Sequence, residues 1–212
     1  MLVVVAIESA GPDKRACRLL FGPGMPEGYV LPKAVVKELS IEEGTTIPSL
    51  QELRKRVDEA EPSAAMARCL RLLNARDKTT HELRTRLARD GYHGRSIDKT
   101  IDRLVELALV DDQRFTENYV DSSLRAKKGW GRIARELARK GIEIDPDDDR
   151  FRPDPEDEYQ AAFTLVERLP VETEKERNRV LRRLITRGYS YPMALRVLDA
   201  RRREVDASGM ML

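Results

Sequence analysis

A short signature that occurs three times constrains the fold of this chain more than any other feature. Gly91, Gly141 and Gly188 each follow a leucine by four residues and another aliphatic residue by eight, and each precedes an apolar residue. Because spacings of four and eight place side chains on one face of a helix, each signature predicts an amphipathic helix. Glycine ends a helix readily, since it adopts the left-handed conformation without a steric cost. Glycines 50 and then 47 residues apart therefore indicate a stacked array of helical repeats.

The sequence predicts a mainly α fold, in which tandem three-helix repeats form an elongated, curved array behind a small N-terminal α+β cap. In the cap, β-prone segments at 2–8 and 16–21 flank a turn sequence and predict a hairpin, whereas the glycines and prolines at 22–28 predict no further strand. Short helices are expected at 32–39 and 48–60. The expected parts are the cap at 1–61, repeats at 62–110, 111–155 and 156–205, and a frayed tail at 206–212.

Within the first repeat, a helix is expected at 64–75, after the break at Pro62. Thr79 and Glu82 match a capping box that starts the second helix, and Ser96 is expected to cap the third.

In the second repeat, Gly129-Trp130-Gly131 introduces the helix that ends at Gly141. The interruptions at 145–149 and 153–155 predict a loop where a third helix would stand, and the third repeat is expected to resume near Glu156. The last helix of the third repeat is expected to end near Arg203.

Charge is strongly segregated along the chain, although the net charge is only +2. Residues 64–142 carry 18 basic and 11 acidic side chains, and residues 143–159 carry 2 basic and 9 acidic ones. A basic centre beside an acidic spacer would attract a polyanion to part of the surface only.

The densest basic cluster lies in the second repeat and is opposed only by Glu136, and related arginines precede the glycines of the other two repeats. Such side chains suit contacts with phosphates or with an acidic protein groove, although a solvated helix face is the alternative. Trp130 either stacks on a base or fills a pocket of a partner, or it anchors a core. Tyr92 and Tyr189 are expected to pack internally. The candidate binding residues are Arg125, Lys127, Lys128, Trp130, Arg132, Arg135, Arg139, Lys140, Arg84, Arg86, Arg89, Arg182, Arg183 and Arg187.

The sequence offers no catalytic or cofactor-binding constellation. It contains no phosphate loop, nucleotide-binding glycine pattern, Ser-His-Asp order or zinc spacing. Four acidic residues fit the spacing of a calcium-binding loop, namely Asp145, Asp147, Asp149 and Glu156. Because Arg150 stands where that loop needs glycine, we favour the interpretation of this stretch as an acidic spacer. Asp111 and Asp112 fit helix capping better than a nuclease metal pair. We therefore expect no enzyme activity, cofactor or metal.

The sequence also indicates the cellular compartment of the protein. No apolar run is long enough to span a membrane, and the apolar start reads as a strand and not as a signal peptide. Cys17 and Cys69 are expected to be small core residues. We expect a monomeric cytoplasmic protein without membrane contacts.

These motifs together resemble the regulatory protein RecX family. The resemblance is carried by Asp111-Asp112-x-Arg114-Phe115, by the Gly-Trp-Gly before Ile133, and by Thr79-x-x-Glu82-Leu83, in that family's order. RecX proteins are tandem three-helix repeats that bind and restrain the RecA recombinase filament. Two features depart from the family pattern: the short segment from Trp130 to Ile133 and the acidic stretch at 143–159.

The resemblance implies a non-enzymatic regulator of the RecA–DNA filament that lowers its recombinase, ATPase and coprotease activities, and so modulates recombination, DNA repair and the SOS response. Its partners would be RecA and, weakly and without sequence preference, single- or double-stranded DNA. Two other functions stay open. One is a stand-alone, sequence-nonspecific DNA- or RNA-binding regulator, and the other is a metal-dependent nuclease, which lacks a convincing set of ligands.

Overall fold

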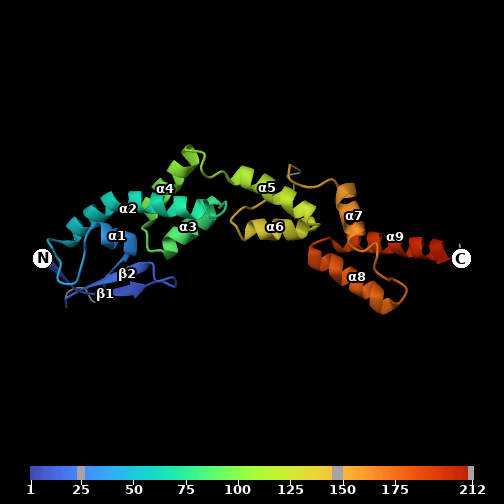
Figure 1. The fold of residues 1–212 in the computed structure, drawn as a ribbon, viewed down its shortest axis with the longest axis horizontal. Helices are drawn as coiled ribbons and strands as arrows, with labels where there is room; N and C mark the ends of the chain where they lie inside the picture. Colours follow the sequence, from blue (N-terminus) through green and yellow to red (C-terminus); the bar gives the residue numbers. More distant parts are fainter. Residues whose placement is uncertain (23–26, 145–149, 210–212) are drawn as a thin grey trace. The chain divides into compact units, whose positions relative to one another are not determined.

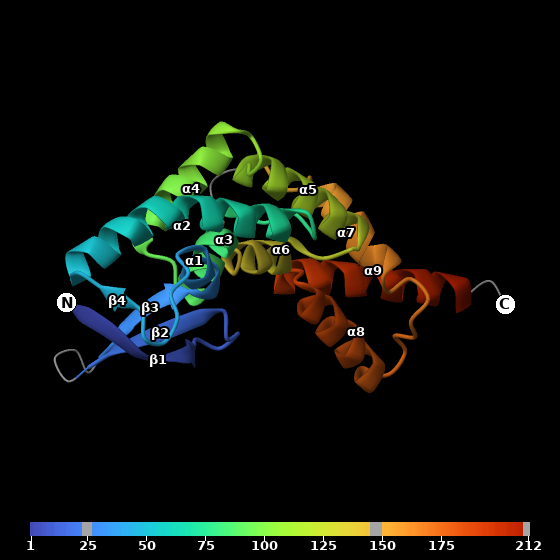
Figure 2. The same ribbon diagram turned by 60° about the vertical axis from the view of Figure 1, so that its left-hand side comes forward.

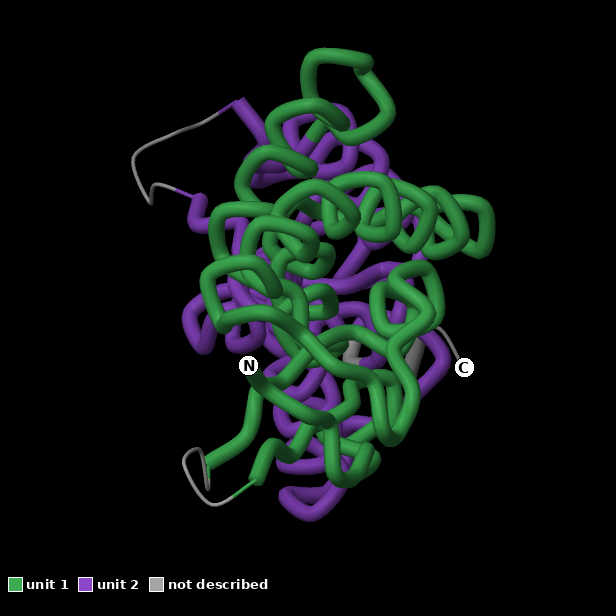
Figure 3. Tube along the Cα trace, turned by 90° about the vertical axis from the view of Figure 1, so that its left-hand side faces the viewer, with its two compact units in different colours: residues 1–111 green, residues 112–212 purple. Residues whose placement is uncertain are grey.

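The computed structural model describes residues 1–22, 27–144 and 150–209, and the chain divides into two compact units, residues 1–111 and 112–212 (Figure 3). The buried apolar residues form one core in the first unit and two in the second. The fold is mainly helical with a small N-terminal antiparallel sheet, as the sequence predicts.

The first unit opens with a sheet of strand order β3-β2-β1-β4. The predicted hairpin is confirmed as β1 (Leu2–Ala10) and β2 (Ala16–Phe21). The prediction of no further strand is wrong, because β3 (Tyr29–Pro32) pairs with β2 and β4 (Thr46–Ile47) pairs with β1. Both of these strands are short, and they are stabilised by pairing with their neighbours and by the burial of Leu31 and Ile47. A local sequence pattern cannot predict such contacts.

Two helices of this unit lie on one side of the sheet in both views (Figures 1 and 2). Helix α1 (Lys33–Glu38) starts after Pro32, as predicted. Helix α2 (Leu50–Leu73) starts at the Ser49 cap, and it runs unbroken through Pro62. The predicted break at that proline is therefore wrong. The helix survives the lost backbone donor because both halves bury residues in the same core, with Val57 before the proline and Ala65 after it.

The first unit closes with α3 (Thr80–Arg89) and α4 (Gly94–Glu106). The Thr79–Glu82 capping box is confirmed, with both of its hydrogen bonds present. The prediction for Ser96 is wrong: α4 begins at the His93 cap, and Ser96 is buried inside the first turns, where it packs and does not cap.

The second unit contains five helices among its described residues: α5 (Asp112–Arg125), α6 (Trp130–Ala138), α7 (Pro155–Thr164), α8 (Glu174–Arg187) and α9 (Tyr191–Gly209). Helices α7, α8 and α9 share one core, and α5 and α6 share another. The described residues between α6 and α7 form no helix, in line with the predicted loop, and Ile142, Ile144 and Phe151 from this stretch pack on the α5–α6 core. Helix α9 runs to Gly209, so its predicted end near Arg203 is too early.

The three repeated glycines end their helices in the same way. Gly91, Gly141 and Gly188 all have positive φ, at 90°, 78° and 99°. In each case the N–H of the following residue donates to the carbonyl of the leucine four before the glycine, with N···O distances of 3.1, 3.0 and 3.1 Å. Those leucines are fully buried. The signature is therefore a helix C-terminal motif whose apolar residues anchor each repeat in its core.

Candidate functional site

The site is framed by a close contact between the start of α6 and the end of α8. The Gly129 N–H donates to the Arg187 carbonyl at 2.9 Å, and the Gly131 N–H donates to the Gly188 carbonyl at 3.1 Å. A Cβ on Gly129 would collide with the backbone of Gly188 and Tyr189, and a Cβ on Gly188 would collide with Arg132. The glycines of the Gly-Trp-Gly motif therefore let two backbones meet, which a larger residue would prevent.

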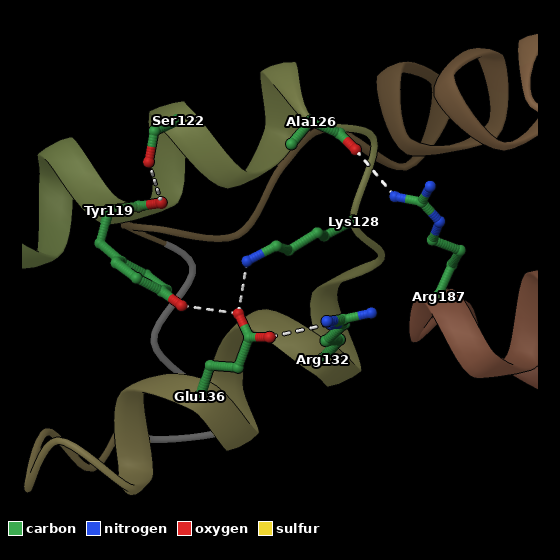
Figure 4. Close-up of polar contacts among 7 residues, drawn as sticks. All are labelled: Tyr119, Ser122, Ala126, Lys128, Arg132, Glu136 and Arg187. Atoms are coloured by element: carbon green, nitrogen blue, oxygen red, sulfur yellow. Dashed lines mark hydrogen bonds and ion pairs between the residues drawn. The ribbon is translucent and has the colours of Figure 1, made fainter.

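Side chains reinforce this contact from both sides. Arg187 Nη1 donates to the Ala126 carbonyl at 3.2 Å, and the buried Tyr189 hydroxyl donates to the Lys127 carbonyl at 3.2 Å. The Trp130 N–H, at the first turn of α6, donates to Glu158 at 2.9 Å. As a result Arg132 of α6 stands beside Arg187 of α8 (Figure 4) and lines the same pocket as three further arginines of that helix.

These residues line a groove of about 540 Å³ on α8, here called the arginine groove. Its apolar part consists of Leu169, Pro170 and Val180, with Thr186 beside them. Its charged part consists of Glu176 and five arginines, namely Arg132, Arg179, Arg182, Arg183 and Arg187.

The arginine groove carries an excess of positive charge. Arg179, Arg182 and Arg183 are exposed, and they form no ion pair with any described residue. Glu176 caps α8 by accepting the Thr173 N–H at 2.9 Å, and this hydrogen bond lowers the pKa of its carboxyl. The groove is thus suited to binding an anion or a carboxylate-rich partner.

A second charged group ties α5 to α6 (Figure 4). Glu136 accepts hydrogen bonds from Tyr119 Oη at 2.6 Å, from Lys128 Nζ at 2.6 Å and from Arg132 Nε at 2.8 Å. Burial by itself raises the pKa of Glu136, but the hydrogen bonds from Lys128, Tyr119 and Arg132 outweigh it and lower the pKa to about 2. Glu136 is therefore ionised at neutral pH and neutralises part of the predicted basic cluster.

The rest of that cluster divides into packing and exposed residues. Lys140 Nζ lies 5.3 Å from the ring centroid of Phe115, and Lys127 is half-buried at a positive φ. Three arginines of the cluster are exposed, and these are Arg125, Arg135 and Arg139. Arg135 Nε also donates to the Gly131 carbonyl at 2.8 Å.

The aromatic side chains considered from the sequence pack against the hydrophobic cores. Trp130 is half-buried and packs against the cluster of Val120, Ile133 and Leu137. Tyr92 and Tyr189 are buried, as predicted, and burial raises the pKa of each to about 12.

The candidate arginines of the first repeat belong to the other unit, and two of them are engaged there. Arg84 pairs with Asp98, and Arg86 pairs with Asp13 at 2.9 Å. Arg89 is exposed. Arg86 therefore links α3 to the turn of the β1–β2 hairpin.

The sequence predictions missed Arg179 and the apolar part of the groove. Arg179 stands three and four residues before Arg182 and Arg183, so helical spacing alone could have placed it on their face. Leu169 and Pro170 come from the loop before α8, and no sequence pattern connects them to the arginines.

The described residues contain no group of three or more His, Cys, Asp or Glu side chains that could hold a metal ion. Asp145, Asp147 and Asp149 of the calcium-loop spacing lie outside the described residues, and Glu156 pairs with Arg196 at 3.1 Å. No helix in the described ranges has the length and apolar character needed to cross a membrane.

Comparison with known proteins gives consistent results. Residues 65–104 match the family model of the first three-helix domain of RecX, and residues 111–145 match that of the second. A crystal structure of regulatory protein RecX aligns with a TM-score of 0.56 at 19% identity, covering 94% of this chain and all of that one. RecX from Lactobacillus salivarius aligns with the same TM-score at 24% identity, covering 69% of this chain and 97% of that one. These two likenesses concern the fold.

The relatives identified by sequence share a higher identity with this chain than those two structures do. Regulatory protein RecX of Mycobacterium sp. (strain JLS) is 36% identical over 154 residues, which cover 66% of this chain and 84% of that protein. Its counterpart in Mycolicibacterium smegmatis is 38% identical over 142 residues, which cover 62% of this chain and 76% of that protein. With this identity over most of each relative's length, and with two RecX domains matched in order, the chain belongs to the RecX family of regulatory proteins.

Proposed function

We propose that this RecX family protein binds the RecA–DNA filament and lowers its recombinase, ATPase and coprotease activities, with no chemistry of its own. The observation that carries the proposal is the arginine groove, in which Arg179, Arg182 and Arg183 are exposed beside an apolar surface without a carboxylate partner among the described residues. A filament of protein and DNA presents both carboxylates and phosphates, and unpaired arginines can bind either.

The exposed arginines outside the groove suit a second, weaker contact. Arg135 on α6 and Arg139, which caps the C-terminus of that helix, are exposed and carry no ion pair to a described residue. Long-range attraction between such cations and DNA speeds association and holds the protein near its partner. We propose that the protein acts as a monomer in the cytoplasm, where it would modulate recombination, DNA repair and the SOS response.

The test is the DNA-dependent ATPase of RecA on single-stranded DNA, measured with increasing amounts of this protein. Substoichiometric protein should lower the ATPase rate and strand exchange, because one bound regulator can affect several neighbouring subunits of a filament. An unchanged rate at saturating protein, with the protein shown by circular dichroism to be folded, would overturn the proposal.

A stand-alone nucleic-acid-binding regulator is the second candidate, and the exposed arginines of α6 favour it. The two functions differ in their need for RecA. Immobilised protein should retain RecA in the absence of DNA if the first function is correct, and it should retain only DNA or RNA if the second is.

A further inference from the structure

We infer that the arginine groove binds an acidic peptide segment of a protein partner and seats one apolar side chain of that segment on Leu169 and Pro170. The inference deepens the proposed function and rests on it, since the segment would belong to the protein component of the filament.

The charged part of the groove matches carboxylates in spacing. Arg179, Arg183 and Arg187 follow one another at four-residue intervals on α8, so their Cα atoms are about 6 Å apart along the helix axis. In an extended peptide, alternate side chains are about 6.7 Å apart. Acidic residues at alternate positions could therefore each meet a guanidinium, whose planar donors suit a carboxylate in a bidentate arrangement.

The apolar part of the groove indicates what lies between those carboxylates. Leu169 is half-buried and Pro170 is exposed, so these two residues present apolar surface at the groove beside the arginines, whereas Val180 is buried beneath them. A phosphate chain has no group to bury there, whereas a peptide can place a leucine or a similar side chain on this surface.

The composition of the groove argues for a peptide over a single-stranded nucleic acid. Proteins that bind single strands combine a basic groove with aromatic side chains on which bases stack. Among the described residues that line this groove none is aromatic.

The groove is held in its shape before any partner arrives. Arg187 is fixed by its hydrogen bond to Ala126, and Arg132 is fixed by Glu136 at 2.8 Å. Val180 and Leu184 anchor α8 in its core. A preformed site loses less conformational freedom on binding, so even a short segment can bind with measurable affinity.

The probe for the test is a short fluorescein-labelled peptide that alternates Glu with Ser around one central Leu, added to the full chain and followed by fluorescence anisotropy. The R182A/R183A variant should bind it about tenfold more weakly than the parent. The control variant R202A/R203A changes the same net charge at exposed positions of α9 outside the groove, and its affinity should stay within about twofold. Replacing the central Leu of the peptide by Ser should weaken binding about tenfold, which tests the apolar contact without altering the protein.

A second variant, R182K/R183K, keeps the charge and removes the planar fork, so an intermediate loss is expected. Far-UV circular dichroism should show that α8 remains folded in all variants. Equal losses in R182A/R183A and R202A/R203A would mean attraction by net charge alone and would overturn the inference. Absence of peptide binding would overturn it as well, as would labelled oligothymidine binding that depends on Arg182 and Arg183 more strongly than peptide binding does.

Failure of this inference and failure of the proposed function give different results. If the parent protein lowers the RecA ATPase but does not bind the peptide, the groove assignment fails and the function stands. If the peptide binds through Arg182 and Arg183 while the RecA ATPase is unchanged, the groove assignment stands and the function fails.

Discussion

At the scale of single residues, Glu136 shows that members of a basic cluster can stabilise the fold by pairing with a carboxylate inside the protein. Its carboxylate accepts hydrogen bonds from Tyr119 on α5, from Lys128 in the connection and from Arg132 on α6. Two of the cations that look free in the sequence are therefore used inside the protein. This leaves Arg125, Arg135 and Arg139 as the exposed members of the cluster.

We expect Glu136→Gln to lower the free energy of unfolding of the second unit by roughly 2 kcal/mol at neutral pH. The folded pKa of about 2 lies below the ordinary value of 4.5, so the stabilisation is present above that value and is lost as the pH falls toward 2. The difference between variant and parent should therefore shrink in acid. Urea unfolding can be followed by the fluorescence of Trp130, the single tryptophan, which packs against the same core.

Glu143→Gln is the matched control for this measurement. Glu143 is exposed and forms no ion pair with a described residue, so its removal should change the stability by no more than about 0.5 kcal/mol. Equal effects of the two changes would contradict the role given to Glu136.

A second titratable pair lies in the first unit. Glu61 is fully buried in α2 and its carboxylate lies 2.7 Å from Nδ1 of His93, with Tyr29, Asp58 and Arg54 nearby. The hydrogen bond that protonated His93 donates to the Glu61 carboxylate raises the pKa of His93 above its usual value of 6.5. A raised folded pKa means that the stabilisation is complete below about pH 6.5 and is lost as the pH rises through the folded pKa.

We expect an NMR titration of the imidazole protons to place the pKa of His93 above 6.5 in the parent, and Glu61→Gln to lower it. Glutamine keeps the size of the side chain but cannot supply the negative charge that favours the imidazolium. A pKa of His93 that is the same in both proteins would show that the contact with Glu61 does not control its protonation.

At the scale of elements, the contact between α6 and α8 depends on glycine. Gly188 has a φ of 99° and lies against Arg132, and Gly129 lies against the backbone of Gly188 and Tyr189. The same residue that ends α8 therefore also allows α6 to start beside it. This contact brings arginines of the second and third repeats into one groove.

We expect Gly188→Ala to lower the unfolding free energy by about 2–3 kcal/mol, because a Cβ is strained at this φ and collides with Arg132. Gly94 is the control, since a Cβ there would meet nothing within 4 Å and its φ is not positive. Gly94→Ala should be neutral or slightly stabilising. Thermal unfolding of both variants checks the prediction, and an equal loss in the two would refute the importance of this contact.

At the scale of the whole molecule, the two units have separate cores and use their exposed arginines differently. The first unit uses its candidate arginines partly for its own structure, as the pairs of Arg84 with Asp98 and of Arg86 with Asp13 show. The second unit presents the arginine groove and the exposed arginines of α6. We therefore expect the second unit to carry most of the contacts with polyanions.

Free DNA should bind weakly and with little sequence preference, because exposed arginines contact phosphates and no base-reading module is present in the sequence. The logarithm of the binding constant should fall steeply and linearly with the logarithm of the salt concentration. Changing Arg135 and Arg139 to alanine should reduce this slope by about 1–2, whereas R202A/R203A should leave it nearly unchanged. Salt-insensitive binding in a filter or anisotropy titration would contradict this expectation.

The sequence by itself determined the features that depend on neighbours along the chain. The helix ends at Gly91, Gly141 and Gly188 follow from apolar spacing and from the freedom of glycine, and the Thr79 cap follows from a local hydrogen-bond pattern. The first hairpin could be predicted for the same reason, because its strands are adjacent in the chain.

Tertiary structure alone decided what depends on contacts between distant residues. Pairing with β2 made a strand of residues 29–32, and burial of both halves in one core kept α2 intact across Pro62. Arg132 lines the arginine groove because the backbone of Gly129 meets that of Gly188, which places Arg132 beside Arg187. Helical periodicity reports which face of one helix is charged, but it contains no information on which other helix will meet that face.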